Sequence, residues 1–356
     1  MNISRTLRAR AAWPAAVIVA CALAACGGDD NPSGTPPTPF KVTNLVSDGT
    51  IAAAHADANL VNGWGVAFNP TGFIWVANAG TAKSTLYDGN GVVQSLVVAT
   101  PPSPTGIVYS GSTDFVVTKA GVSAPSRFIF ASEGGMLAGW APSVSLNSTV
   151  TVYDGSAAGK SYKGLAISAQ GLYATDFHNG AVDTFDRTFT PFSIAGRFKD
   201  PALPAGYAPF GIQAIGNQIY VTYAKQDAQA HDAVNGAGLG VVDVFDTTGA
   251  FFKRLVTGGA LNAPWGVALA PAGFGTFSNA LLVGNFGDGK INAYNPATGD
   301  FLGTLGKADG TPIVIDGLWG IAFGNGINAT QPTTTLFFAS GPADETHGLY
   351  GRIDLQ

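Results

Sequence analysis

The stretch WGVAF at residues 64–68 decides the fold, because altered copies of it recur along the chain. In every copy a variable residue precedes a glycine, and a mostly aliphatic stretch follows. The six copies are WGVAF (64–68), TGIVY (105–109), KGLAI (163–167), FGIQA (210–214), WGVAL (265–269) and WGIAF (319–323). Their spacing runs from 41 residues, between Trp64 and Thr105, to 58 residues, between Thr105 and Lys163. A period of this length predicts β units that stack or stand around an axis.

A strand, a polar turn and another strand follow the copies of the motif. Three such segments align without a gap: FIWVANAGTAKSTLY (73–87), GLYATDFHNGAVDTF (171–185) and ALLVGNFGDGKINAY (280–294). Two others carry insertions in the turn: QIYVTY (218–223) resumes as GVVDVF (240–245), and TLFFAS (335–340) resumes as GLYGRI (348–353). In the second repeat there are two candidates for the second strand, FVVT (115–118) and FIFAS (128–132). The turn SEGG and the strand MLAGW that follow FIFAS favour the latter.

Units of about 50 residues with four short antiparallel strands are typical of β-propeller blades. The sequence therefore predicts an all-β fold, a six-bladed β-propeller over residues 40–356. The last unit reaches Gln356 without an outer strand, whereas FKVTNLVS (40–47) alternates and precedes the first copy. We expect this N-terminal strand to complete the last blade, which closes the ring and covers an exposed edge. The alternative, a two-domain β-sandwich, leaves the six copies unexplained.

Composition and charge agree with a folded β protein and exclude some functions. The 48 glycines and 21 prolines, beside 22 Phe, 10 Tyr and 6 Trp, suit short strands joined by tight turns. Only 12% of the residues are charged and 46% are hydrophobic, which excludes a disordered chain. With 18 Lys and Arg against 23 Asp and Glu, the chain lacks the basic excess of a nucleic-acid-binding protein. We therefore expect no nucleic acid among its partners.

The first 25 residues have the pattern of a secretory signal. Arg5, Arg8 and Arg10 precede an apolar stretch, 11–25, that is too short to span a bilayer. We expect residues 1–25 to be cleaved. The chain has two cysteines, Cys21 inside this signal and Cys26 directly after it. We therefore expect no disulfide and no cysteine chemistry in the exported domain.

The sequence LAAC at residues 23–26 resembles the lipobox of bacterial lipoproteins. This resemblance implies a lipidated Cys26, and the Gly27 that follows favours the outer membrane, with the protein facing the periplasm or the cell surface. Residues 26–39, rich in Pro, Gly and Asp, form the predicted tether. The membrane is then contacted only through the lipid anchor. The alternative is an ordinary signal peptide with a chance cysteine.

The repeats also resemble a known family of propellers, the NHL type. The stretches LVNGWGVAF (60–68), AKQDAQAHDAVNGAGLGVVDVFD (224–246) and ETHGLYG (345–351) resemble, more closely, an uncharacterised group of exported bacterial propellers. This resemblance covers residues 40–356 and implies the fold. It implies no activity.

Candidate binding residues lie where the propeller has its channel mouth. The residue before each motif glycine and the residue at each aligned turn are expected around this mouth, where apolar walls and a few polar groups make a binding site. The predicted ligand-binding residues are Trp64, Lys163, Asp176, Trp265, Asn285 and Trp319. The alternatives are that the tryptophans pack between blades, that Asp176 caps its own turn, and that Lys163 is a solvated charge.

A metal site is a second hypothesis for the same face. All four histidines are expected on it, and carboxylates accompany two of them. The candidate metal ligands are His55, His178, His231, Asp232, Glu345 and His347. Their nitrogen and oxygen donors suit a divalent metal such as zinc or calcium, although no cofactor is certain and no pair has a diagnostic spacing. The alternative is a set of polar loop residues facing water.

Two functions follow from these patterns. The first is a lipid-anchored envelope propeller, monomeric, that binds a protein or small-molecule ligand through the loop-rich mouth face. The second is a metal-dependent hydrolase of the lactonase or esterase type, in which a metal-bound water attacks the substrate. Six-bladed lactonases of the gluconolactonase type bind a divalent metal through Asn and Asp residues and through a Glu at the start of an inner strand. This chain has Trp, Phe, Thr and Lys there, which speaks against a lactonase.

Overall fold

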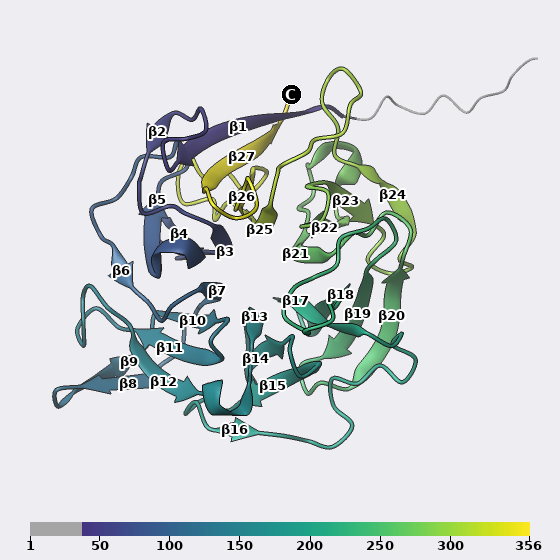
Figure 1. The fold of residues 1–356 in the computed structure, drawn as a ribbon. Helices are drawn as coiled ribbons and strands as arrows, with labels where there is room; N and C mark the ends of the chain where they lie inside the picture. Colours follow the sequence, from purple (N-terminus) through teal and green to yellow (C-terminus); the bar gives the residue numbers. More distant parts are fainter. Residues whose placement is uncertain (1–37) are drawn as a thin grey trace, which may run out of the picture. The chain divides into compact units, whose positions relative to one another are not determined.

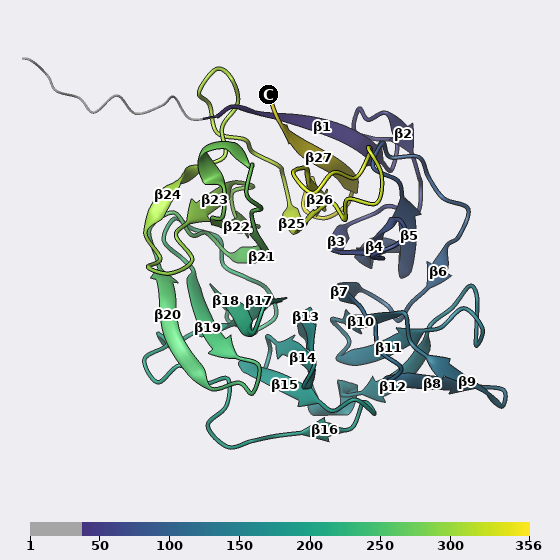
Figure 2. The same ribbon diagram turned by 180° about the vertical axis from the view of Figure 1, so that it is seen from behind.

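The computed structural model describes residues 38–356, which form six small sheets arranged in a ring (Figures 1 and 2). These residues contain 27 strands, three short 3₁₀ helices and no α-helix. The predicted all-β, six-bladed propeller is confirmed. Residues 1–37, which hold the predicted signal peptide, Cys26 and most of the tether, lie outside the described residues.

The first three blades each have four strands, and their bounds follow. Blade 1 consists of β3 (Gly63–Phe68), β4 (Ile74–Asn78), β5 (Lys83–Tyr87) and β6 (Val98–Ala99). Blade 2 consists of β7 (Pro104–Tyr109), β10 (Phe128–Ser132), β11 (Met136–Trp140) and β12 (Val150–Asp154), with a hairpin of β8 (Val116–Lys119) and β9 (Val122–Pro125). Blade 3 consists of β13 (Tyr162–Ser168), β14 (Gly171–Asp176), β15 (Ala181–Phe185) and β16 (Pro191–Phe192).

The other three blades follow the same plan, except that blade 6 has a fifth strand. Blade 4 consists of β17 (Tyr207–Ile215), β18 (Gln218–Lys225), β19 (Val241–Asp246) and β20 (Phe251–Thr257). Blade 5 consists of β21 (Pro264–Leu269), β22 (Leu281–Asn285), β23 (Ile291–Tyr294) and β24 (Phe301–Thr304). Blade 6 consists of β25 (Leu318–Phe323), β26 (Leu336–Ser340), β27 (Leu349–Leu355), β1 (Phe40–Ser47) and β2 (His55–Ala56). The 3₁₀ helices are η1 (Ala79–Thr81), η2 (Ser156–Ala158) and η3 (Gly275–Phe277).

Two finer predictions about the strands are also confirmed. Strand β1 pairs antiparallel with β27, from Phe40 opposite Leu355 to Ser47 opposite Leu349, so the N-terminal strand closes the ring. In blade 2 the stretch FIFAS forms β10, which lies between β7 and β11. Most of the competing stretch, FVVT, lies in β8 of the separate hairpin.

The motif glycines lie where one inner strand passes close to the inner strand of the next blade. A Cβ atom on Gly65 would lie 2.5 Å from the carbonyl oxygen of Thr105, and one on Gly266 would lie 2.5 Å from that of Trp319. Such distances are too short for any side chain. The same close approach to the neighbouring blade occurs at Gly106, Gly164, Gly211 and Gly320. The repeat is therefore a packing requirement, since a glycine in each blade lets the inner strands meet around the axis.

We expect Gly266→Ala to destabilise the propeller by about 1–3 kcal/mol, the usual cost of forcing extra atoms into a packed interior. Gly306→Ala is a matched control, because its new Cβ would have its nearest neighbour 3.5 Å away at ordinary contact distance. Urea unfolding of both variants measures the difference. Equal midpoints would mean that the inner strands can move apart without cost.

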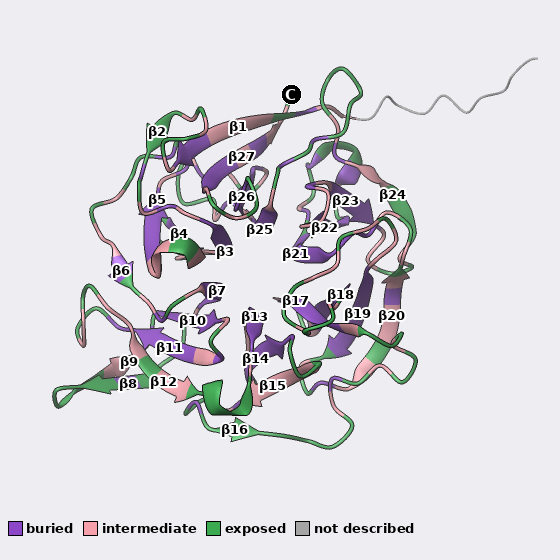
Figure 3. Ribbon diagram, in the orientation of Figure 1, coloured by how far each residue is buried: buried purple, intermediate pink, exposed green. Residues whose placement is uncertain are grey.

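The core of the ring lies between blades. The second strand of every blade is buried along most of its length, whereas outer strands are partly exposed (Figure 3). In residues 38–356, six hydrophobic clusters each join two neighbouring blades, and a seventh, rich in aromatic rings, lies where the inner strands begin. The stability of each blade therefore depends on its packing against both neighbouring blades.

Blade 4 contains a buried carboxyl group that makes stability depend on pH. Asp243 on β19 is fully buried, and within the described chain neither of its oxygens has a hydrogen-bond partner. Burial raises the pKa of Asp243 to about 8. The negative charge of Asp200 contributes to this increase, and the positive charge of Arg254 opposes it. The folded state therefore keeps a proton that the unfolded state releases near its ordinary pKa. By linkage, stability falls as pH rises from about 4 to 8.

We expect Asp243→Asn to remove this decline, because the amide cannot ionise. At pH 8 the variant should be more stable than the wild type by at least about 1.4 kcal/mol, the free energy of one pKa unit. Urea unfolding between pH 5 and 8.5 measures the effect, and the exposed Asp300→Asn is the control. The same pH slope in Asp243→Asn and wild type would contradict a protonated Asp243.

Candidate functional site

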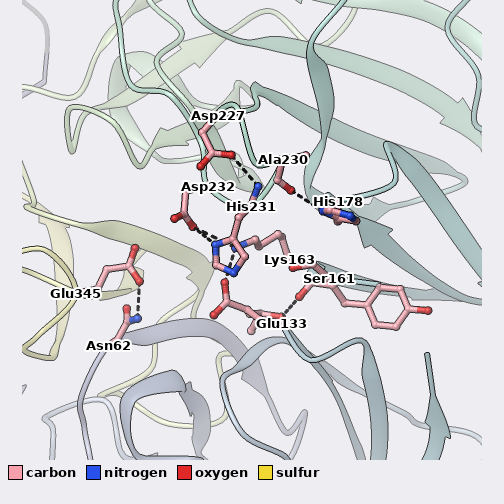
Figure 4. A network of polar contacts seen from close by, with 12 residues as sticks. Asn62, Glu133, Ser161, Lys163, His178, Asp227, Ala230, His231, Asp232 and Glu345 are labelled. Carbon is pink, nitrogen blue, oxygen red and sulfur yellow. Dashed lines mark hydrogen bonds and ion pairs between the residues drawn. The ribbon is translucent and has the colours of Figure 1, made fainter. Parts of the chain in front are cut away.

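Charged side chains from four blades meet on one face of the ring, here called the mouth face. This face carries the loops that lead into the inner strands and the loops between second and third strands. We define the mouth network as the polar side chains that converge there, drawn in Figure 4: Asn62, Glu133, Lys163, His231, Asp232 and Glu345.

Lys163, at the start of β13, is the centre of the mouth network. Its side chain is only 2% exposed, and its Nζ forms an ion pair with Glu133 of the β10–β11 turn. The Nζ also lies 3.7 Å from Oδ1 of Asp232, in the β18–β19 loop. Below it, the ring centroid of Trp64 is 5.6 Å away, a distance at which an aromatic face attracts a cation. Carboxylates and an aromatic ring thus compensate the buried charge.

Glu345, in the β26–β27 loop, completes the acidic side of the network. Its Oε2 accepts a hydrogen bond of 2.7 Å from Nδ2 of Asn62. Burial raises the pKa of Glu345, and the charges of Glu133 and Asp232 raise it further, against the opposing effects of Asn62 and Lys163. Three carboxylates therefore share the mouth with one lysine, which makes the local potential negative.

Two predicted histidines lie in or beside the network. The Nδ1 of His231 is 2.9 Å from Oδ1 of Asp232, and its backbone N–H donates to Oδ1 of Asp227. The Nδ1 of His178, in the β14–β15 turn, is 3.2 Å from the carbonyl oxygen of Ala230. The insertion between β18 and β19 therefore reaches over blade 3, as Figure 4 shows.

The three predicted tryptophans form a stacked aromatic plug beneath the network. Trp64 and Trp319 stack with centroids 3.5 Å apart, and Trp265 meets both edge to face at 6.0 and 5.7 Å. Phe286 stacks on the other side of Trp319 at 4.1 Å. Trp64 and Trp319 are each 1% exposed and Trp265 is 8% exposed. The tryptophans thus fill the top of the channel and support Lys163, whose carbonyl oxygen accepts from Nε1 of Trp265.

The predicted residues Asp176 and Asn285 are buried at the ends of the second strands of their own blades. Asp176 accepts from the backbone N–H of Ser161 at 3.1 Å and from Nδ2 of Asn179 at 2.8 Å. Asn285 donates through Nδ2 to the carbonyl oxygen of Ala260 and to Oδ1 of Asp288. Both side chains stabilise turns, and neither joins the mouth network.

The remaining two histidines lie on blade 6. The Nδ1 of His347 is 2.7 Å from Oδ2 of Asp48 and 3.0 Å from Oγ1 of Thr50. Although burial alone raises the pKa of Asp48, the hydrogen bond with His347 lowers it below its ordinary value. His55 is exposed on β2, which pairs with the outer strand β1. The structure therefore places these two histidines apart from His231.

The six candidate metal ligands are distributed over these separate places. In the part of the chain that the structure describes, no three His, Cys, Asp or Glu side chains group closely enough to hold a metal ion. The metal site stays a prediction. In the same residues no helix is long and apolar enough to cross a membrane.

Sequence reasoning did not identify two members of the network, Glu133 and Asn62. Glu133 follows the second strand of its blade, one residue after Ser132, which is the residue equivalent to Asp176 and Asn285. Asn62 stands two residues before Trp64 and accepts a hydrogen bond from Nε1 of Trp319 at 3.2 Å. The repeats could have identified Glu133 only if the residue after the aligned turn position had been considered, and no pattern indicated Asn62.

Known proteins are similar to this chain in sequence or in fold. The chain is 34% identical, over 330 residues, to an uncharacterised protein of Acanthamoeba polyphaga mimivirus, covering 89% of this chain and 80% of that protein. A second uncharacterised protein of the same virus is 31% identical over 328 residues, covering 88% and 85%. The solved structure of a streptogramin B lyase matches with a TM-score of 0.52 at 13% identity, covering 90% of this chain and 98% of that one, which shows a shared fold alone. No protein-family model matches the chain.

Proposed function

The chain belongs to the same family as the two mimivirus proteins, and we propose that it is an exported, lipid-anchored propeller that binds a cationic ligand at its channel mouth. The observation that carries the ligand site is the mouth network, in which four blades bring charged groups together. Burying a charge is costly unless partners compensate it, and the network places three carboxylates where one would balance Lys163.

The sign of the charge points to the class of ligand. Glu133, Asp232 and Glu345 surround a single lysine, and Asp232 is well exposed. A guanidinium or ammonium group that reached this rim would find carboxylate acceptors not fully used by Lys163. Hydrogen bonds between such charged groups are about twice as strong as neutral ones. A basic side chain of a peptide or a small amine therefore fits the mouth.

The proposal of export and anchoring rests on the N-terminal sequence. Arg5, Arg8 and Arg10, the apolar stretch and the LAAC sequence together have the pattern of a lipoprotein signal. The tether that follows would hold the propeller near the membrane. These residues lie outside the described part of the chain.

We expect Cys26→Ser to release the protein from the membrane fraction, because the proposed acyl attachment point is lost. Fractionation and labelling with a fatty acid in a Gram-negative host measure this change. Cys21→Ser is the matched control and should stay lipidated, since Cys21 lies inside the apolar stretch that is removed. Fatty acid label on the Cys26→Ser protein would contradict the proposed anchor.

We expect tri-arginine to bind at the mouth and tri-citrulline, its uncharged isostere, to bind at least tenfold more weakly. Glu345→Gln should weaken tri-arginine binding by about tenfold, or about 1.4 kcal/mol, without changing the fold. Asp344→Asn is the control, because Asp344 is the exposed neighbour of Glu345. Calorimetry at physiological salt measures the affinities.

Binding should also weaken as pH falls through the raised pKa of Glu345, because protonation removes an acceptor charge. If tri-arginine and tri-citrulline bind equally, or if both variants behave as wild type, the acidic mouth is not the ligand site.

A further inference from the structure

Blade 3 has an outer edge that its own fourth strand covers only in part. Strand β15 pairs with β14 along its whole length, from Ala181 to Phe185. On its other side only Thr184 and Phe185 pair with β16. Over the described chain no strand covers the outer side of Ala181, Val182 and Asp183. In Figures 1 and 2, β16 and the loop after it run along the rim of the ring.

The other two-residue fourth strand does not leave such an edge. In blade 1, β6 is also only two residues long and pairs with Lys83 and Ser84 at one end of β5. At the other end Val93 forms a bridge with Tyr87, and the N–H of Gln94 donates to the carbonyl oxygen of Leu86. Strand β5 is therefore covered from both ends, so the uncovered stretch of β15 is not a general result of a short fourth strand.

A groove of about 630 Å³ lies along this edge. One wall is β15 from Ala181 to Thr184, and the other is the segment 191–199, which leaves the sheet after β16. Tyr153 of β12, in blade 2, lines the groove as well. The groove therefore occupies the place where the remainder of a fourth strand would lie.

The chemistry of the groove suits an acidic, partly apolar chain. Arg197 and Lys199 line it, and they form no ion pair within the described residues. Lys160 and Asp183 also line it, but they form an ion pair with each other, and Lys160 binds Asp176 as well. Phe192 and Ile194 stand beside the basic residues with 39% and 49% of their surfaces exposed. Alternating acidic and apolar side chains of an extended chain would meet both kinds of surface.

We propose that the free edge of β15 is a docking site for an extended acidic peptide segment of a partner protein, which adds to blade 3 as a further strand. Main-chain hydrogen bonds to residues 181–183 hold the segment, and Arg197 and Lys199 select its charge. Strand addition to an exposed sheet edge is an established mode of peptide recognition, and uncovered edges otherwise favour aggregation. This site is separate from the mouth network and does not depend on the proposed cationic ligand.

A pool of blocked decapeptides in which Glu alternates with Val, Ile, Phe or Thr is the probe. We expect this pool to bind the full chain and to slow hydrogen exchange of the amides in residues 181–184. The double variant Arg197→Glu, Lys199→Glu should weaken binding by at least tenfold. Lys307→Glu, an exposed lysine of blade 5, is the matched control and should bind as wild type does.

Two further probes separate strand addition from simple charge attraction. The same pool with N-methyl groups on alternate residues keeps its charge but loses main-chain donors, and we expect it not to bind. A pool with Lys in place of Glu should not bind either. The proposal is overturned if the N-methylated pool binds equally, if no protection appears at residues 181–184, or if the free protein dimerises through this edge. Binding that is equal in the charge-reversed variant overturns it as well.

Discussion

Deleting residues 40–47 should prevent the whole propeller from folding stably, because β1 joins blade 6 to its neighbours on both sides. Phe40 is fully buried, with its ring centroid 4.8 Å from that of Phe274 of blade 5, and its N–H donates to the carbonyl oxygen of Gly306. At the other end Leu45 and Val46 pack in the cluster between blades 6 and 1. The deletion therefore opens two interfaces and exposes the edge of β27.

The expected loss is comparable to the stability of a typical domain. Removing one buried Phe costs about 3–5 kcal/mol and removing a buried Leu costs about 2–5 kcal/mol, whereas whole domains are stable by about 5–15 kcal/mol. Loss of the cooperative transition in circular dichroism is the expected result. A deletion variant that melts at the wild-type temperature would show that the ring does not depend on β1.

A single substitution gives a graded version of the same test. Phe40→Ala should lower the melting temperature by roughly 6 °C or more, since about 3 kcal/mol is lost and each kcal/mol shifts a large domain by about 2–4 °C. Phe252→Ala is the control, because that ring is 65% exposed on the outer strand β20. Its melting temperature should stay close to that of the wild type.

The fold could be predicted from the sequence because its main requirement is local and repeated. Each blade needs a glycine where its inner strand approaches the inner strand of the next blade. A close approach such as that of Gly65 to Thr105 leaves no room for a side chain. The hairpin that follows has the same length in three blades, and in two others the extra residues lie in the turn, so its strands can be aligned without a structure. Ring closure could be predicted as well. The last repeat lacks an outer strand, and the strand at 40–47 belongs to no other repeat, so it can fill that place.

The candidate site could be predicted only in part, because it depends on contacts between loops of different blades. The mouth face was expected to carry Lys163, His231, Asp232 and Glu345, and all four lie in the mouth network. What no repeat pattern encodes is the path of each loop. The β18–β19 loop extends over blade 3 through its own hydrogen bonds, such as that of His231 to Asp227.

The same limit explains the residues that the structure keeps out of the network. Asp176, Asn285 and Ser132 end the second strands of their blades, and each is bound by groups of its own blade. Glu133 is the residue after Ser132. Glu133 instead reaches across to Lys163. Equivalent positions in a repeat thus receive different partners, because neighbouring side chains differ from blade to blade.

Trp319→Ala is expected to destabilise the propeller by about 3–5 kcal/mol, the usual cost of truncating a large buried aromatic side chain. The ring of Trp319 lies between Trp64 and Phe286 and contacts Trp265 edge to face. Removing it would leave a cavity at the axis and unsupported rings from blades 1 and 5. The Oδ1 of Asn62 would also lose its indole donor.

This variant decides between two roles of the tryptophans that the sequence left open. If they are an aromatic plug, Trp319→Ala should unfold at much lower urea concentration, and Trp319→Phe should recover part of the loss because a ring still stacks. Phe301→Ala, on the exposed strand β24, is the control for removing an aromatic ring without opening the core. If instead Trp319→Ala keeps the wild-type urea midpoint and loses only tri-arginine binding, the tryptophan is a ligand contact. Lys163 stands above Trp64, so a collapsed plug should lower both stability and binding, with the loss of stability already present in the free protein.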